Sequence, residues 1–114
     1  METSVRPTEI TGVRVTIALP TFNGEHLLGR AIDSVLRQTY RNWELTISDN
    51  ASTDGTRAVC ERAAASDERI TYVRQPVNLG MTGNFAFLAE VSSGPYFMYL
   101  GNDDWSLRPS SRGA

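Results

Sequence analysis

Segments with the period-two pattern of a β-strand alternate along this chain with segments that have the pattern of an amphipathic helix. The strand patterns cover residues 13–19, 43–48, 70–73 and 96–100, and the helical patterns begin near Leu27, after Asp54 and near Thr82. Strict alternation of the two is typical of a parallel sheet whose crossover helices cover both of its faces. The chain is therefore predicted to adopt an α/β fold with a Rossmann-like, mostly parallel sheet.

The boundaries of these elements follow from residues that end strands or begin helices. Pro20 closes the first strand pattern and is predicted to end that strand. Oxygen-bearing and small side chains precede the first two helical patterns and are predicted to cap the helices, namely Asn23, Gly24, Ser52, Thr53 and Asp54. The folded unit is predicted to span residues 13–105. Residues 1–12 and 106–114 lack this periodicity and are predicted to be disordered tails.

Residue types that are rare or missing exclude several kinds of chemistry. All eleven basic residues are arginines, so the chain has no lysine for a phosphate-binding loop or a Schiff base. A single histidine and a single cysteine exclude two-histidine zinc motifs and internal disulfides. Cys60 lies on the apolar side of a helical pattern and is predicted to be a buried structural thiol. Carboxylates, hydroxyls and arginines remain as the groups that carry function.

Net charge and hydrophobicity limit the classes of partner and the locations expected for this chain. A net charge of −2 disfavours binding to nucleic acid. The 114 residues fit one small domain or part of a larger one, and a hydrophobic content of 40% is enough for a buried core. No apolar run is long enough to span a bilayer, and the N-terminus lacks the apolar segment of a signal peptide. No transmembrane segment and a cytoplasmic location are therefore expected.

Polar residues follow the strand patterns at their carboxyl ends. The last strand pattern leads directly into Asn102, Asp103 and Asp104. Adjacent carboxylates repel one another unless a cation offsets them, and oxygen ligands suit Mg²⁺ or Mn²⁺. If the first and fourth strands flank the point where the strand order reverses, residues 20–23, 49–50 and 102–104 meet in one crevice. A solvated turn at residues 102–104 is the alternative.

Two other loop motifs give weaker matches. Residues 50–61 approach the spacing of a calcium-binding EF-hand loop, but a strand pattern rather than a helix precedes them. Residues 80–83 contain two glycines, but the first strand-to-helix turn lacks the glycines of a dinucleotide fingerprint. We therefore reject the calcium loop and do not expect a nicotinamide-dependent enzyme.

Several motifs, in this order and at these spacings, resemble family 2 glycosyltransferases, which are nucleotide-sugar enzymes with the A-type glycosyltransferase fold. They are VTIALPTFN (15–23), AIDSVLRQTY (31–40), WEL (43–45), SDNASTDGT (48–56), NLG (78–80) and NDD (102–104). The resemblance covers the chain from about Val13 to Trp105. It implies the donor-binding half of such a transferase, which binds a nucleotide-diphosphate sugar of the UDP or dTDP type in cell-envelope polysaccharide synthesis.

The resemblance also implies roles for individual residues. Five matching positions would line or face the donor pocket, namely Pro20, Thr21, Asn23, Glu25 and Asn84. Asp49 would accept a hydrogen bond from the base of the nucleotide. The alternatives stay open that Thr21 and Asn23 only cap a helix and that Asp49 only ends a strand.

The metal site is implied at the end of the fourth strand. Asp103 would hold the Mg²⁺ or Mn²⁺ that bridges the donor diphosphate, with Asp104 assisting and Asn102 beside them. The family often has an aspartate at the position of Gly101, and its absence here predicts a weaker affinity for the metal. In an inverting transfer, this metal stabilises the negative charge that grows on the leaving diphosphate.

The catalytic base that would take a proton from the acceptor hydroxyl has no counterpart among these residues. In the family that carboxylate and the acceptor-binding half follow the metal signature, whereas nine residues follow Trp105 here. We expect donor binding with little or no transfer by this chain alone. The alternatives are a non-catalytic interaction module that self-associates or pairs with an acceptor half and, last, a different α/β nucleotide-binding enzyme such as a nucleotidyltransferase.

Overall fold

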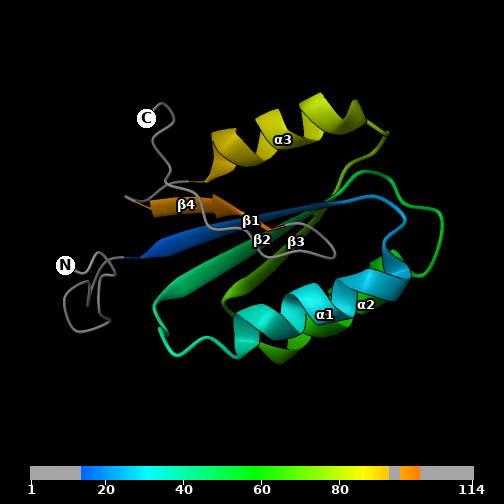
Figure 1. The fold of residues 1–114 in the computed structure, drawn as a ribbon. Helices are drawn as coiled ribbons and strands as arrows, with labels where there is room; N and C mark the ends of the chain where they lie inside the picture. The colour runs from blue at the N-terminus through cyan, green and yellow to red at the C-terminus, as the bar shows by residue number, and fades with distance from the viewer. Residues whose placement is uncertain (1–13, 93–95, 101–114) are drawn as a thin grey trace.

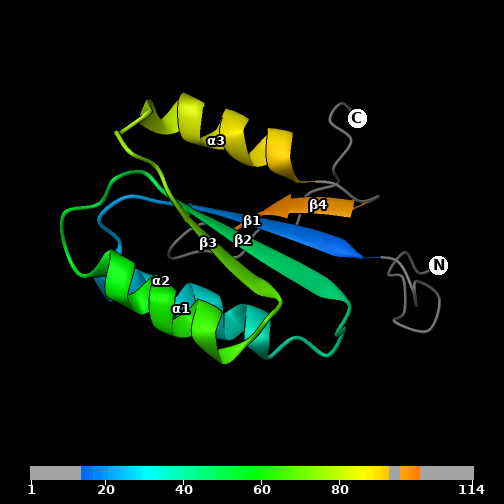
Figure 2. The same ribbon diagram turned by 180° about the vertical axis from the view of Figure 1, so that it is seen from behind.

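The computed structural model describes residues 14–92 and 96–100. Along these residues the elements are β1 (Val15–Thr21), α1 (Glu25–Leu36), β2 (Trp43–Asp49), α2 (Thr56–Ser66), β3 (Ile70–Arg74), α3 (Gly80–Val91) and β4 (Tyr96–Tyr99). The described strands form a parallel sheet in the order β3-β2-β1-β4. Figures 1 and 2 show α1 and α2 on one face of this sheet and α3 on the other. The predicted α/β fold with helices on both faces is therefore confirmed.

The strand order reverses between β1 and β4. After β1 the chain adds β2 and then β3 on one side, and it returns to place β4 on the other side of β1. Ala18 of β1 lies in register with Tyr99 of β4, and the two strands run in the same direction. The first and fourth strands are thus neighbours, which is the condition that the predicted crevice requires. Ligands of α/β sheets bind at such a reversal, outside the carboxyl ends of the strands.

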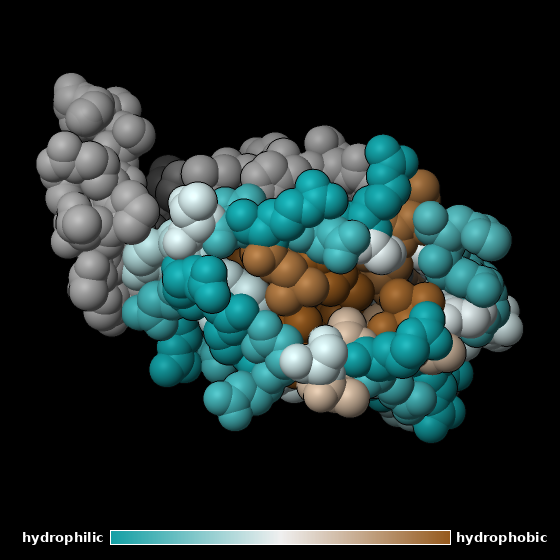
Figure 3. Space-filling model, turned by 90° about the horizontal axis from the view of Figure 1, so that it is seen from below, coloured by the Kyte–Doolittle hydropathy of each residue, from teal (hydrophilic) through white to brown (hydrophobic). Residues whose placement is uncertain are grey.

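The face of the sheet that α1 and α2 cover holds the apolar core. Ile17 and Leu19 of β1 lie in register with Leu45 and Ile47 of β2, and all four side chains are buried. They belong to one cluster with buried residues of the two helices, namely Leu28, Ala31, Ile32, Val35 and Cys60. Figure 3 views this side and shows apolar surface in a central band between hydrophilic margins. The period-two pattern that predicted the strands therefore also selects their buried face.

The opposite face meets α3 through polar and aromatic contacts. Ser48 of β2 donates from its hydroxyl to Asn84 Oδ1 of α3 at 2.6 Å. The rings of Phe85 on α3 and Tyr99 on β4 pack edge to face with centroids 4.7 Å apart. These contacts place the N-terminal half of α3 over the carboxyl ends of the central strands. None of the helices in the described ranges combines the length and the apolar character that a membrane span needs.

Pro20 lies inside β1, so the prediction that it ends the first strand is wrong. The carbonyl of Ala18 accepts from Leu100 N on the β4 side, whereas that of Thr21 accepts from Asn50 N on the β2 side. The backbone groups of successive residues point to opposite sides of a strand, so the backbone nitrogen of Pro20 points toward the β4 side. Pro20 lies just beyond the Ala18–Tyr99 pair, so its missing N–H removes a bond only at the very end of this ladder.

Candidate functional site

Hydrogen bonds join the loop after β1 to the loop after β2. Asn23 N donates to Ser52 Oγ at 2.8 Å, and Thr53 N donates to Asn23 Oδ1 at 2.8 Å. Gly24 N donates to Thr56 Oγ1 at 2.9 Å. The prediction that Asn23, Ser52 and Thr53 cap the helices that follow them is wrong, since their side-chain oxygens bond across the two loops, whereas Gly24 is the N-cap of α1 and Asp54 Oδ1 accepts from Thr56 N at the start of α2. These groups bond across the two loops because the parallel strands deliver the loops side by side.

Two acids complete this junction. Glu25 Oε1 accepts from Gly55 N at 2.9 Å, and Asp54 Oδ2 accepts from Glu25 N at 3.3 Å. Asp54 also accepts from the hydroxyl and the backbone N–H of Thr56. The hydroxyl of Thr56 is the main reason why the pKa of Asp54 is lowered. The N-terminus of a helix carries partial positive charge, so the negative charges of Glu25 and Asp54 are favourable beside the starts of α1 and α2. Both acids therefore stabilise the two loops.

Asp49, the residue predicted to contact a base, is fully buried at the end of β2. Its Oδ1 accepts from Ser52 N at 2.9 Å, while its Oδ2 accepts from the hydroxyl of Tyr72 at 2.6 Å and pairs with Arg74 Nη1 at 3.3 Å. The pKa of Tyr72 is raised, mainly by burial and next by the hydrogen bond that its hydroxyl donates to Asp49. The contact with a base stays a prediction, and in this structure the carboxylate holds Ser52 and therefore the loop that follows β2.

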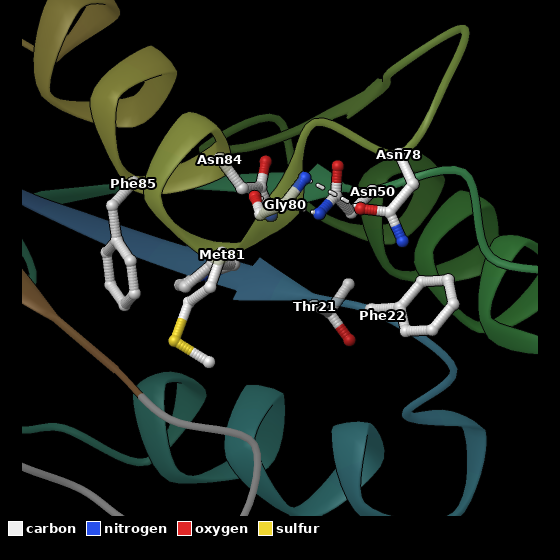
Figure 4. A pocket seen from close by; sticks show the side chains of 9 residues that line it. Thr21, Phe22, Asn50, Asn78, Gly80, Met81, Asn84 and Phe85 are labelled. Atoms are coloured by element: carbon white, nitrogen blue, oxygen red, sulfur yellow. Dashed lines mark hydrogen bonds between the residues drawn. The ribbon is translucent and has the colours of Figure 1, made fainter.

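A cavity of about 570 Å³ opens at the carboxyl ends of β1 and β2, beside the start of α3. Six of its lining residues come from the end of β1 and from α3, namely Pro20, Thr21, Phe22, Gly80, Met81 and Phe85. The other three are asparagines, namely Asn50, Asn78 and Asn84 (Figure 4). Pro20, Thr21 and Asn84 were predicted to line or face a donor pocket, and the structure brings all three to this cavity. The predicted Asn23 and Glu25 lie at the loop junction and not in the lining.

Thr21 gives the cavity an unpaired polar group. Its side chain is 3% exposed, and its hydroxyl has no hydrogen-bond partner among the described residues. A buried hydroxyl without a partner costs about 1–3 kcal/mol, so such groups are rare unless another molecule completes them. The volume of the cavity lies in the range of small-molecule sites. A ligand of the cavity that reached this hydroxyl would supply the missing hydrogen bond.

Two asparagines of the lining bond within the protein through both the oxygen and the nitrogen of their amides. Asn84 accepts from Ser48 Oγ at 2.6 Å and donates to Ser48 O at 3.1 Å. Asn50 accepts from Leu79 N at 2.7 Å and donates to Gly80 O at 3.2 Å. Both therefore hold the wall formed by the start of α3 against the end of β2. This wall needs no ligand to stay in place, so the cavity is preformed.

The predicted metal ligands Asn102, Asp103 and Asp104 lie outside the described residues. Within the described ranges, no group of three or more histidine, cysteine or acidic side chains is placed to hold a metal ion. Cys60 is buried in the core as predicted, and burial raises the pKa of its thiol to about 12. The thiol therefore stays protonated at neutral pH and is no nucleophile.

Phe22 and Asn50 line the cavity and belong to the loops at residues 20–23 and 49–50 that were predicted to meet in a crevice, although neither was given a role of its own. No position in the site was predicted for Asn78, Met81 and Phe85, although Asn78 lies within a motif of the family resemblance. These three residues lie near the start of α3. Their approach to β1 depends on the crossover from β3, which no local pattern in the sequence reveals.

Comparison with known proteins gives consistent results. The pattern of the family described as glycosyl transferase family 2 matches residues 16–109. A UDP-Glc:alpha-D-GlcNAc-diphosphoundecaprenol beta-1,3-glucosyltransferase of Escherichia coli, WfgD, is 38% identical over 91 residues, which are 79% of this chain and 35% of WfgD. The glycosyltransferase GlyA of Streptococcus pneumoniae is 32% identical over 81% of this chain and 13% of GlyA. The chain thus spans about a third or less of the length of these curated relatives.

Solved structures share the arrangement of strands and helices. The mannosyltransferase PcManGT from Pyrobaculum calidifontis, solved in complex with GDP-Man and Mn²⁺, superposes with a TM-score of 0.68 at 27% identity, over 75% of this chain and 26% of PcManGT. Staphylococcus aureus TarS 1–349, solved in complex with UDP, superposes with a TM-score of 0.73 over 81% of this chain and 28% of TarS 1–349. At 20% identity the second likeness concerns the fold alone.

Proposed function

Since the chain belongs to glycosyl transferase family 2, we propose that it is the donor-binding part of a glycosyltransferase. Its sheet has the A-type glycosyltransferase fold. The donor is a nucleotide-diphosphate sugar of the UDP or dTDP type, and its nucleotide occupies the cavity at the carboxyl ends of β1 and β2. The observation that carries this proposal is the buried, unpaired hydroxyl of Thr21 in a preformed cavity of ligand size.

The lining of the cavity suits a nucleotide. Phe22 is 46% exposed at the end of β1, and an exposed aromatic ring offers a surface on which a base stacks. Pro20 and Met81 add further apolar contacts. Thr21 supplies a hydroxyl that donates to or accepts from the base or the ribose. One face of a planar base is thereby covered, and a polar group of the ligand is fixed.

We assign the metal site to Asp103 and Asp104, with Asn102 beside them. No acid lines the described cavity, and the acids around it are committed, since Asp49 pairs with Arg74 and Glu25 accepts from Gly55. The carboxylates after β4 are therefore the groups left to hold Mg²⁺ or Mn²⁺, and their oxygen atoms suit either ion. A bound divalent ion would neutralise charge on the diphosphate as it leaves.

The proposed reaction is transfer of the sugar, with inversion, to a hydroxyl of an acceptor. Relatives such as WfgD are named for sugars linked to diphosphoundecaprenol, and we extend to this chain a role in cell-envelope polysaccharide synthesis. No described residue is assigned as the base that activates the acceptor. Donor binding, rather than the complete reaction, is therefore what we place on the residues of this chain.

The test is calorimetric titration of the 114-residue chain with UDP and dTDP in the presence of Mn²⁺, together with thermal denaturation. Both nucleotides are expected to bind and to raise the melting temperature, because a ligand of the native state stabilises it. Asp103→Ala is expected to remove the part of the affinity that depends on Mn²⁺. Absence of binding by UDP, dTDP and their sugar derivatives would overturn the proposal.

A further inference from the structure

Asn78 differs from the other two asparagines that line the cavity. Asn50 and Asn84 are buried and use both the oxygen and the nitrogen of their amides within the protein. Asn78 is exposed, and its Oδ1 accepts from Gly80 N at 2.7 Å. Its Nδ2 has no hydrogen bond to any described residue. Asn78 therefore brings to the cavity an amide whose donor side is free.

The orientation of this amide is fixed by its neighbour. Gly80 begins α3 with a φ of +78°, and its N–H points at the Asn78 side chain. A backbone N–H accepts nothing, so only the oxygen of the amide satisfies it, and a flipped amide would set two donors against each other. Figure 4 shows the amide nitrogen of Asn78 directed away from Gly80, toward the side of the cavity where Phe22 lies.

The exposed ring of Phe22 sets where a base lies in the cavity. Figure 4 shows the Phe22 ring and the Asn78 amide on the same side of the cavity, away from Phe85. A base stacked on Phe22 therefore lies beside the donor side of the Asn78 amide.

We propose that Asn78 determines base specificity, by donating an amide hydrogen bond to an exocyclic carbonyl oxygen of a base stacked on Phe22. This inference rests on the proposed function, since it requires that the cavity take a nucleotide. Uracil, thymine and guanine present such an oxygen on the edge away from the ribose. Cytosine and adenine present an amino group there, which would face the Asn78 donor and leave both groups unpaired.

The experiment compares UDP with CDP, whose bases differ at the edge concerned, by calorimetric titration of the 114-residue chain with Mn²⁺ present. The wild-type chain is expected to bind UDP at least about tenfold more tightly than CDP. This is the difference in affinity expected when one base accepts the hydrogen bond from Asn78 and the other leaves the amide donor without an acceptor. Asn78→Asp keeps an oxygen for Gly80 N and replaces the donor by an acceptor. The ratio of the two affinities is then expected to fall to about one or to reverse.

Two further variants separate specificity from charge and folding. Asn42→Asp makes the same substitution just before β2, at the opposite end of the sheet, and is expected to keep the wild-type ratio. Asn78→Ala removes the donor without adding charge and is expected to bring the ratio near one. A thermal melt of each variant verifies that it is folded.

The outcomes distinguish this inference from the proposed function. Equal affinities of the wild-type chain for UDP and CDP, or an unchanged ratio in Asn78→Asp, would overturn the role of Asn78 and leave nucleotide binding established. If no nucleotide binds, both the role of Asn78 and the proposed function fall.

Discussion

Replacing Thr21 by valine should make the chain more stable and a weaker binder of nucleotide. Valine has nearly the shape of threonine, suits a strand, and replaces the unpaired hydroxyl by a methyl group. The substitution removes a buried polar group that nothing in the described protein satisfies. It also removes the group that the proposed ligand would satisfy, so the two effects have opposite signs.

The magnitudes follow from the cost of an unpaired group. A buried hydroxyl without a partner costs about 1–3 kcal/mol. Relief of part of that cost should raise the free energy of unfolding by about 1 kcal/mol, which corresponds to roughly 4–8 °C in Tm for a domain of this size. Loss of one hydrogen bond to a ligand, worth about 0.5–1.5 kcal/mol, should weaken nucleotide binding about 2- to 12-fold.

Thr56→Val is the matched control. The Thr56 hydroxyl is buried like that of Thr21, but it accepts from Gly24 N and donates to Asp54. Its loss should therefore destabilise the chain by about 1–3 kcal/mol. Thermal denaturation followed by circular dichroism measures stability, and titration with UDP and Mn²⁺ measures affinity. A lower Tm together with unchanged affinity in Thr21→Val would refute the reasoning.

Two further predictions concern groups away from the cavity. Asp49→Ala should lower the free energy of unfolding by about 2–4 kcal/mol, because Tyr72, Arg74 and Ser52 N lose their acceptor; an unchanged urea midpoint would count against this network. The pKa of Cys60 is raised from 9.0 to about 12 in the folded chain, so between these values the folded state binds more protons than the unfolded state, and stability should fall as pH rises. Urea denaturation across this pH range should show a shallower decline in Cys60→Ala, and equal slopes would contradict the assignment.

Much of the fold follows from local patterns in the sequence. The buried positions of β1 and β2 alternate because one face of the sheet packs on α1 and α2, so the periodicity of Ile17, Leu19, Leu45 and Ile47 predicts both strands. The periodicity did not predict that Pro20 lies within a strand. Whether a proline fits there depends on which neighbouring strand its missing N–H would face. That neighbour is set by where β4 ends, which is a property of the assembled sheet.

The surroundings of the site residues likewise depend on the assembled sheet and not on local patterns in the sequence. Asp49 and Asn50 are adjacent at the end of β2, and a carboxylate is the better acceptor for a base. Alternation stops being informative where the strand ends, and Ala51, with a φ of +65°, turns the chain there. Tyr72 and Arg74 on β3 then enclose the carboxylate, while Asn50 lines the cavity. Those two partners lie more than twenty residues away, and spacing alone does not reveal them.

The junction of the loops after β1 and β2 has a consequence for how this region opens. The N–H groups of Asn23, Gly24, Thr53 and Gly55 are each satisfied by a side chain from the other loop. Neither helix can fray at its start without releasing acceptors that the other helix needs. The first turns of α1 and α2 therefore form one cooperative unit, and their amides should exchange with solvent through a single shared opening rather than two independent ones.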